Sequence, residues 1–138
     1  LDSATGLLQW HTFLGSARAT TAADVVVETG RGTIFVTGYS DGPFGQPWHP
    51  YTASADVFLA EFSPTGALQR TGFFGAIGFD VATALAFEPA SRAVIIAGYS
   101  DEAWGDTDDA VFSYNGGLDG FVARIDLNAR LFLPALSR

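Results

Sequence analysis

The chain has no cysteine, no methionine and no lysine. The lack of cysteine excludes disulfide bonds, cysteine nucleophiles and thiolate metal sites, and it leaves the redox compartment open. Basic residues are scarce, because seven arginines stand against 15 acidic residues and give a net charge of −8. This charge argues against nucleic acid and against an anionic membrane surface as partners.

Long apolar segments are also absent, since no window approaches the length of a transmembrane helix. We therefore expect no membrane insertion. The sequence begins at Leu1 without a methionine, so we expect a processed subunit or a piece of a longer protein, with any signal peptide outside it. Apolar material is nevertheless ample, because 48% of the 138 residues are hydrophobic and can fill a core of domain size.

An internal repeat is the strongest pattern in the sequence. Residues 3–45 align without a gap on residues 63–105, and 14 of the 43 aligned positions are identical. Unrelated sequences of this composition would share about two or three identities, so the chain is a tandem repeat with a period of 60 residues. After a longer second loop the match resumes with a shift of 63, pairing Asp56 with Asp119 and Phe58 with Phe121.

Short apolar runs between glycines predict four strands in each repeat. The runs TIFVTGY and AVIIAGY are β-branched and aromatic, and they are too short for an ordinary helix. Both faces of these strands are apolar, which predicts sheets covered on both sides. The predicted strands are 22–28, 33–39, 57–62 and 67–74 in the first repeat, and 82–88, 93–99, 120–126 and 130–136 in the second.

The fold we predict is all-β, with four-stranded antiparallel blades of the β-propeller type. Blades of this kind stack by radial repetition, and each buries its faces on its neighbours. We expect strands 22–28 and 82–88 to be innermost. The chain then divides into an outer strand of a preceding or neighbouring blade at 1–15, a first blade at 16–75 and a second blade at 76–138.

Several segments resemble the bacterial β-propeller repeat called the SBBP repeat: DVFLAEFSPTGALQRTGFFG, DGFVARIDLNARLFL, LDSATGLLQWHTFLG, FVTGYSD and IIAGYSD. The resemblance covers nearly all of the chain. One departure follows the fourth strand, where the family commonly has a glycine pair and this chain has only Gly15 and Gly75. The resemblance implies a repeat module of a large secreted or surface protein, and it implies no catalytic residues.

Two repeats are too few to close a propeller, which needs roughly four to eight blades. Open faces and unpaired strand edges are seldom tolerated, so we expect as partners other copies of the chain or the rest of a longer propeller. Residues 7–14 match the outer strand 67–74 and predict a strand donated to the final blade, most readily that of a neighbouring chain. The competing strand 130–136 contains Pro134, which has no amide hydrogen. The predicted assembly strand consists of Leu7, Leu8, Trp10, Phe13 and Leu14.

The second long loop is rich in carboxylates, and oxygen-rich loops can bind Ca²⁺. A solvated acidic loop is the alternative interpretation, which we favour because the first repeat keeps only Asp41 there. The candidate metal ligands are Asp101, Asp106, Asp108 and Asp109.

Aromatic residues gather in the long loop of each repeat. On a propeller such side chains can stack on sugar rings or anchor a protein partner, and they can equally cap the edge of a sheet or pack against a subunit. We favour the capping interpretation and keep carbohydrate or protein binding as the alternative. The candidate ligand-binding residues are Trp48, His49, Tyr51, Trp104 and Tyr114.

Catalytic patterns are weak. Neither His11 nor His49 lies near a Gly-x-Ser-x-Gly turn, so a serine hydrolase is not indicated. Glycosidases need two carboxylates flanking a cleft, and Asp24 and Asp80 are the nearest pair, although they do not occupy equivalent positions.

The sequence therefore predicts an extracellular or cell-surface assembly module that is not an enzyme and needs no cofactor beyond a possible Ca²⁺. A carbohydrate- or protein-binding module, and a fragment of a propeller glycosidase, remain as alternatives.

Overall fold

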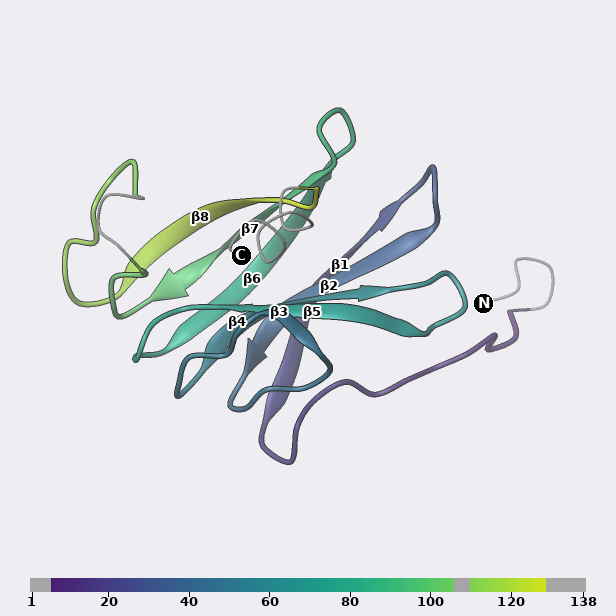
Figure 1. The fold of residues 1–138 in the computed structure, drawn as a ribbon, viewed down its shortest axis with the longest axis horizontal. Helices are drawn as coiled ribbons and strands as arrows, with labels where there is room; N and C mark the ends of the chain where they lie inside the picture. Colours follow the sequence, from purple (N-terminus) through teal and green to yellow (C-terminus); the bar gives the residue numbers. More distant parts are fainter. Residues whose placement is uncertain (1–5, 106–109, 129–138) are drawn as a thin grey trace, which may run out of the picture.

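The computed structural model describes residues 6–105 and 110–128, and every regular element in them is a β-strand (Figure 1). The strands are β1 (Thr20–Glu28), β2 (Thr33–Ser40), β3 (Pro47–His49), β4 (Asp56–Phe62), β5 (Leu68–Phe74), β6 (Asp80–Glu88), β7 (Ala93–Ser100) and β8 (Asp119–Asp126). The all-β prediction is confirmed, and seven of these strands were predicted from the sequence. The predicted strand 130–136 lies outside the described residues.

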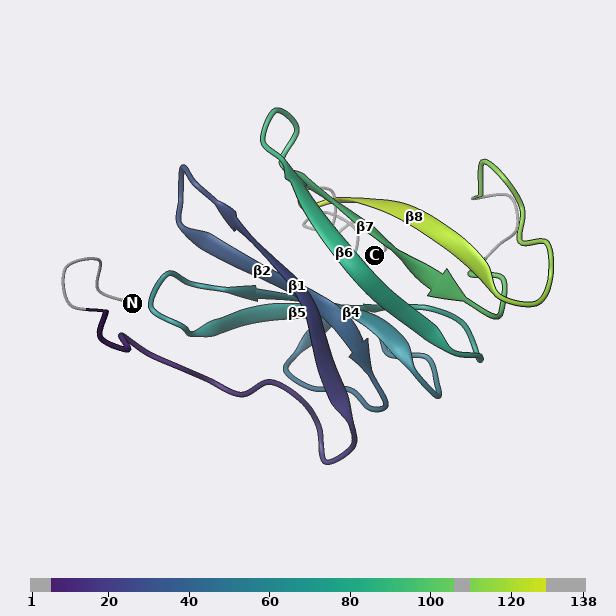
Figure 2. The same cartoon turned by 180° about the vertical axis from the view of Figure 1, so that it is seen from behind.

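The strands form two separate sheets. The first sheet has the order β1-β2-β4-β5-β3, in which β3 runs parallel to β5 and the other neighbours are antiparallel. The second sheet has the order β6-β7-β8 and is antiparallel. Seen from behind, β6 lies beside β1, where the sheets meet (Figure 2).

The first sheet has five strands, where four were predicted. The additional strand β3 comes from the Pro-rich loop between β2 and β4 and pairs with the outer edge of β5. Gly72 on β5 makes this possible, because a side chain there would come within 2.9 Å of the Trp48 ring. No alternation of polar and apolar residues marks so short a strand, and its pairing depends on this tertiary contact.

The repeat seen in the sequence is also present in the backbone. A β-bulge interrupts the β1–β2 register between Ala22 and Asp24, and the same irregularity separates Ala82 from Ala84 in the second sheet. Opposite each bulge stands the glycine of the Gly-Tyr-Ser-Asp motif. A side chain at Gly38 would lie only 1.8 Å from the carbonyl oxygen of Thr21, so the motif requires glycine.

The main core lies between the two sheets, where β6 packs against β1, β2 and β4. Removal of these apolar side chains from water is the main stabilising term for the pair of sheets. Rings stack across the junction, with the centroids of Phe35 and Phe87 5.7 Å apart. The buried members of this core are Phe35, Val57, Leu59, Ala82, Leu85, Val94, Ile96 and Leu127.

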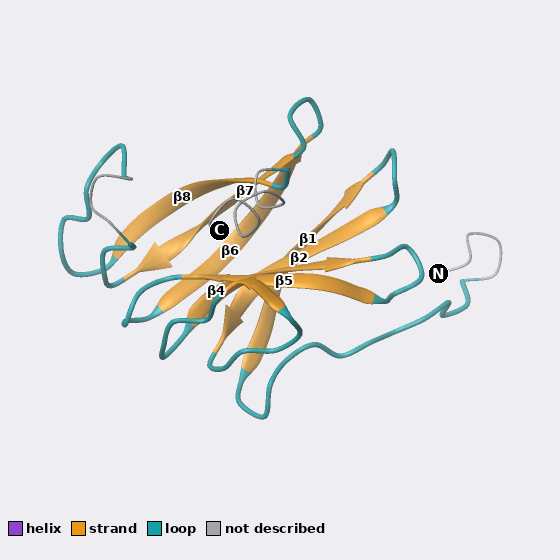
Figure 3. Cartoon of the chain, viewed as in Figure 1, coloured by secondary structure: helices purple, strands orange, loops and turns teal. Residues whose placement is uncertain are grey.

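A second core covers the opposite face of the first sheet. Loop residue Phe44 lies edge-on to both Phe58 and Phe73, with centroids 5.3 Å apart in each pair. Leu14, from the N-terminal segment, packs against this cluster. The described residues contain no helix that could cross a membrane, and Figure 3 shows only strands and loops in them.

Candidate functional site

The first two predicted ligand-binding aromatics lie on the edge of the first sheet. The Trp48 ring packs on Phe74 with a centroid distance of 5.6 Å, and His49 stacks on the same ring at 4.7 Å. The Nδ1 atom of His49 also hydrogen-bonds the carbonyl oxygen of Phe73. These side chains hold β3 against β5.

Tyr51 and Tyr114 occupy equivalent places in the two repeats. The Tyr51 hydroxyl lies 2.9 Å from the carbonyl oxygen of Asp41 and 2.6 Å from that of Ser54, and burial raises its pKa. The Tyr114 hydroxyl makes the corresponding contacts with Asp101 at 2.6 Å and Gly117 at 2.7 Å. Both hydroxyl groups thus fasten a long loop to the end of the preceding strand.

Trp104 takes the place in the second sheet that Phe44 has in the first. Its ring centroid lies 4.4 Å from that of Phe121, the counterpart of Phe58. Its indole nitrogen donates to the Asp80 carboxylate at 2.6 Å. Trp104 therefore packs as a core residue of the junction.

The predicted calcium loop is only partly described, because Asp106, Asp108 and Asp109 lie outside the described residues. Asp101 is exposed, and its carboxylate accepts a hydrogen bond of 2.6 Å from the Phe79 amide. Within residues 6–105 and 110–128, no three or more histidine or carboxylate side chains gather as a metal site would require.

Asp56 and Asp80 form a buried pair of carboxyl groups between the sheets, and both side chains are fully buried. Gly75 lies between them, since a side chain there would meet both carboxyl groups within 2.9 Å. Burial raises the pKa of Asp56, and the nearby charge of Asp80 raises it further. Asp56 Oδ2 accepts from the Thr52 amide at 2.6 Å, whereas Oδ1 has no hydrogen-bond partner within the described residues.

Asp24, which was considered together with Asp80 as a glycosidase pair, has a structural role. Asp24 accepts a hydrogen bond of 2.8 Å from the Leu85 amide, and so links β1 to β6 across the junction. Its other oxygen accepts from the Val25 amide at 2.9 Å. Because Asp80 is fully buried, the two carboxylates do not face each other across an open cleft.

A charged network at the junction was missed by sequence reasoning. Arg92, in the β6–β7 turn, donates to both carboxylate oxygens of Glu28 at 3.1 and 3.0 Å and lies 3.7 Å from Glu61. Arg70 pairs with Glu61 from the other side. The hydrogen bond from Arg92 lowers the pKa of Glu28, and the same bond raises the pKa of Arg92. The detectable signal was a difference between repeats, because Arg92 replaces Gly32.

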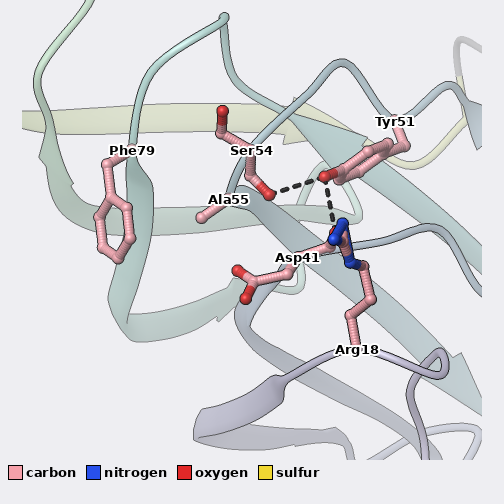
Figure 4. A pocket seen from close by; sticks show the side chains of 6 residues that line it. All are labelled: Arg18, Asp41, Tyr51, Ser54, Ala55 and Phe79. Atoms are coloured by element: carbon pink, nitrogen blue, oxygen red, sulfur yellow. Dashed lines mark hydrogen bonds between the residues drawn. The ribbon is translucent and has the colours of Figure 1, made fainter.

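A shallow hollow of about 350 Å³ opens where the two repeats meet at the loop end of the first sheet. Figure 4 shows the Phe79 ring and the Asp41 carboxylate on one side, with the Arg18 guanidinium close to Tyr51. Phe79 is 45% exposed. The second repeat has Gly78 in place of Arg18, so it has no guanidinium at the position that lines this hollow.

The predicted assembly strand forms no strand within the chain, since residues 6–19 pair with none of the described strands. Figure 1 shows this segment running outside the sheets toward β1. Trp10 anchors it by donating its indole N–H to the carbonyl oxygen of Pro64 at 3.1 Å. Phe13 is 91% exposed, and Leu7 and Leu8 are more than half exposed.

The outer edge of β8 is unpaired as far as the structure describes the chain. The equivalent edge of β4 is covered by β5. An unpaired edge leaves backbone N–H and C=O groups ready to pair with another strand.

Comparisons with known proteins do not place the chain in a family. It matches no protein-family model, and no curated protein sequence matches it.

Proposed function

We propose that the chain is a non-enzymatic extracellular assembly module, built as two blades of the β-propeller type. In this proposal residues 7–14 become a strand beside β8 of a neighbouring copy. If the chain is part of a longer propeller, the same segment completes the adjoining blade. The proposal rests on the contrast between β4, whose edge is covered, and β8, whose equivalent edge is not.

The register between β4 and β5 in the first sheet predicts how the donated strand would pair with β8. On β5, Phe73 stands opposite Phe58 of β4. The repeat places Phe13 at the position of Phe73 and Phe121 at the position of Phe58. A donated Phe13 would therefore lie opposite Phe121.

An incomplete aromatic cluster supports this placement. In the first sheet Phe44 contacts two rings, Phe58 and Phe73. In the second sheet, among the residues that the structure describes, Trp104 contacts one such ring, that of Phe121, the counterpart of Phe58. Phe13 of a neighbouring copy would supply the third ring, and burial of a side chain that is now 91% exposed would favour association.

The decisive experiment changes Phe13 in the full-length chain. Because Phe13 is exposed within one chain, Phe13→Asp leaves the fold intact, while a donated aspartate would be buried beside Phe121. We expect the parent to form oligomers at micromolar concentration by light scattering, and Phe13→Asp to shift them to monomers. Val111→Asp is the matched control, because Val111 is 94% exposed and lies outside the strands.

Deletion of residues 1–14 provides a second test. The truncated chain should lose the oligomers, and a synthetic peptide of residues 3–16 added in excess should bind to it, measured by isothermal titration calorimetry. If the truncated chain kept the parent's oligomeric mass, strand donation would be wrong.

Carbohydrate binding is a second candidate function, favoured by the hollow beside Phe79. Its exposed ring can stack on a sugar face, while Asp41 and Arg18 can accept from and donate to sugar hydroxyls. A glycan array should then give signals that Phe79→Ala removes. Phe112→Ala, at a ring that is 91% exposed elsewhere, should leave them unchanged, and an array without signals for the parent would exclude this function.

A further inference from the structure

The two sheets of the chain meet through unlike faces. We call the face by which the first sheet meets the second its trailing face, and the face by which the second meets the first its leading face. The trailing face of the first sheet buries Phe35, Val57 and Leu59, and the leading face of the second buries Leu85, Val94 and Ile96. Successive residues of a strand point to opposite faces. Phe35 corresponds to Ile95 in the repeat, so the two faces are opposite sides of the repeating unit.

The leading face of the first sheet and the trailing face of the second sheet therefore have no sheet of the same chain packed against them. The leading face of the first sheet carries Val25 and Val27 on β1, which are 55% and 50% exposed. Their counterparts in the second sheet are Leu85, which is buried, and Phe87, which packs against the same core. Val25 and Val27 on β1 are therefore exposed, whereas the equivalent residues on β6 pack in the junction between the two sheets.

The trailing face of the second sheet shows the complementary pattern. Val122 on β8 is 76% exposed, while its counterpart Leu59 is only 3% exposed. Ala97 stands directly beside Val122 on the neighbouring strand. This face therefore exposes at its centre an apolar side chain whose counterpart is covered within the chain.

The charges on these two faces also match. At the junction between the two sheets of one chain, Arg92 forms ion pairs with Glu28 and Glu61 of the first sheet. On the trailing face of the second sheet, Arg124 stands in place of Glu61 and already pairs with Glu88 at 2.8 Å. The leading face of the first sheet has Gly32 where that of the second sheet has Arg92. Glu88 therefore already has a cation on its own sheet, whereas Glu28 is paired with Arg92 of the other sheet.

The connection preceding each leading face is similar in the two repeats. Gly15 and Gly75 have φ angles of 147° and 157°, which L residues rarely adopt. Phe74, the last residue of β5, packs against the core on the leading face of the second sheet. Its counterpart Leu14 packs against the cluster on the leading face of the first. The N-terminal segment therefore enters the first sheet much as β5 enters the second.

We propose that the trailing face of the second sheet binds the leading face of the first sheet of a second copy of this chain. The copies then join head to tail through two unlike surfaces, a heterologous contact that forms a ring if the rotation closes and a filament if it does not. This inference rests on the proposed assembly function, and it assigns the surfaces that lie against each other when residues 7–14 pair with β8.

The test uses one charged substitution on each face of the full-length chain. Val122→Glu damages only the trailing face, and Val25→Glu damages only the leading face, while the exposure of both positions keeps each monomer folded. We expect each variant to associate at least tenfold more weakly than the parent in sedimentation experiments. Val111→Glu, outside both faces, should associate as the parent does.

Mixing the two variants decides whether the contact joins unlike surfaces. The Val25→Glu chain keeps an intact trailing face, and the Val122→Glu chain keeps an intact leading face, so an equimolar mixture should form a dimer that grows no further. If the mixture stays monomeric, or if either variant assembles like the parent, the assignment of the faces is wrong.

The outcomes separate this inference from the proposed strand donation. If Phe13→Asp prevents assembly and Val122→Glu does not, strand donation stands and face docking is overturned. If Val122→Glu prevents assembly and Phe13→Asp does not, face docking stands without strand donation. A parent chain that is monomeric at micromolar concentration overturns both.

Discussion

The equivalent strands β4 and β8 differ sharply in burial. All seven residues of β4 are buried, while β8 alternates between half-buried and exposed residues. The strand β4 has paired neighbours on both edges and packed side chains on both faces, whereas the described part of the chain gives β8 a neighbour on one edge only. The comparison teaches that neighbouring strands and sheets bury an apolar strand of a repeat. A strand that lacks such neighbours, as β8 does, marks a surface that a further strand or sheet could cover.

The largest expected effect comes from truncating the two central residues of these strands. Leu59→Ala should lower the free energy of unfolding by about 2–5 kcal/mol, because it opens a cavity between the sheets. Val122→Ala should change it by less than about 0.5 kcal/mol in the monomer, because its side chain is already in water. Urea denaturation of dilute protein measures both, and similar losses at the two positions would contradict the comparison.

The second largest difference should be between the contributions to stability of the ion pairs Arg92–Glu28 and Arg124–Glu88, which lie at the trailing faces of the two sheets. Arg92→Ala removes the cation that bonds both oxygens of the buried Glu28, leaving it only the more exposed Arg31, and should cost about 3 kcal/mol. Arg124→Ala breaks a pair whose side chains are 49% and 39% exposed, and should cost much less, because water screens an exposed ion pair.

The first of these pairs also has a pH dependence. Because Arg92 lowers the pKa of Glu28, its stabilisation is present above the ordinary glutamate pKa and is lost as the pH falls through the lowered value. Urea titrations of the parent should show this loss, and those of Arg92→Ala should show less of it, since Arg31 and Thr33 make smaller contributions to the lowered pKa. A parallel pH dependence in the two proteins would argue against the pair.

A smaller effect is expected from the tyrosine hydroxyls. Tyr51→Phe should cost about 1 kcal/mol, because the single hydroxyl proton near the carbonyl oxygens of Asp41 and Ser54 is lost. Tyr114→Phe should cost less, since its hydrogen bonds are exposed to water. Thermal melts of the two variants measure the difference, and a larger loss at Tyr114 would reverse the ranking.

The smallest expected effect concerns Asp56, whose raised pKa has the opposite consequence to that of Glu28. The folded chain holds a proton that the unfolded chain releases, so stability declines as the pH rises from the ordinary aspartate pKa through the raised value. Asp56→Asn keeps an oxygen for the Thr52 amide and, because it cannot ionise, should reduce that decline. An unchanged decline between acid and neutral pH would show that Asp56 ionises normally.

Much of the fold could be predicted because the signals are local. Glycines end the apolar runs, and the runs themselves are β-branched, so strands such as β2 and β7 agree with their predicted bounds to within one residue. The strand β3 could not be predicted, because its pairing depends on Trp48 lying over Gly72, which only the folded chain brings together.

The site was harder to predict than the fold. The loop aromatics were recognised as a group, but their packing on Phe74 and Phe121 depends on tertiary contacts. The junction network joins Glu28, Glu61 and Arg92 from three distant segments, and a sequence shows only that each is charged. A comparison between the repeats contains part of this signal, because Arg92 stands where the first copy has Gly32, and Glu61 stands where the second copy has Arg124.

The Gly32-to-Arg92 difference also constrains how such a gene can be rearranged. Copying the first repeat in place of the second would put a glycine where Glu28 now has its guanidinium partner. Such a duplication would bury Glu28 without Arg92, and we expect the resulting chain to be less stable. One arginine thus makes the two similar repeats unequal as building units.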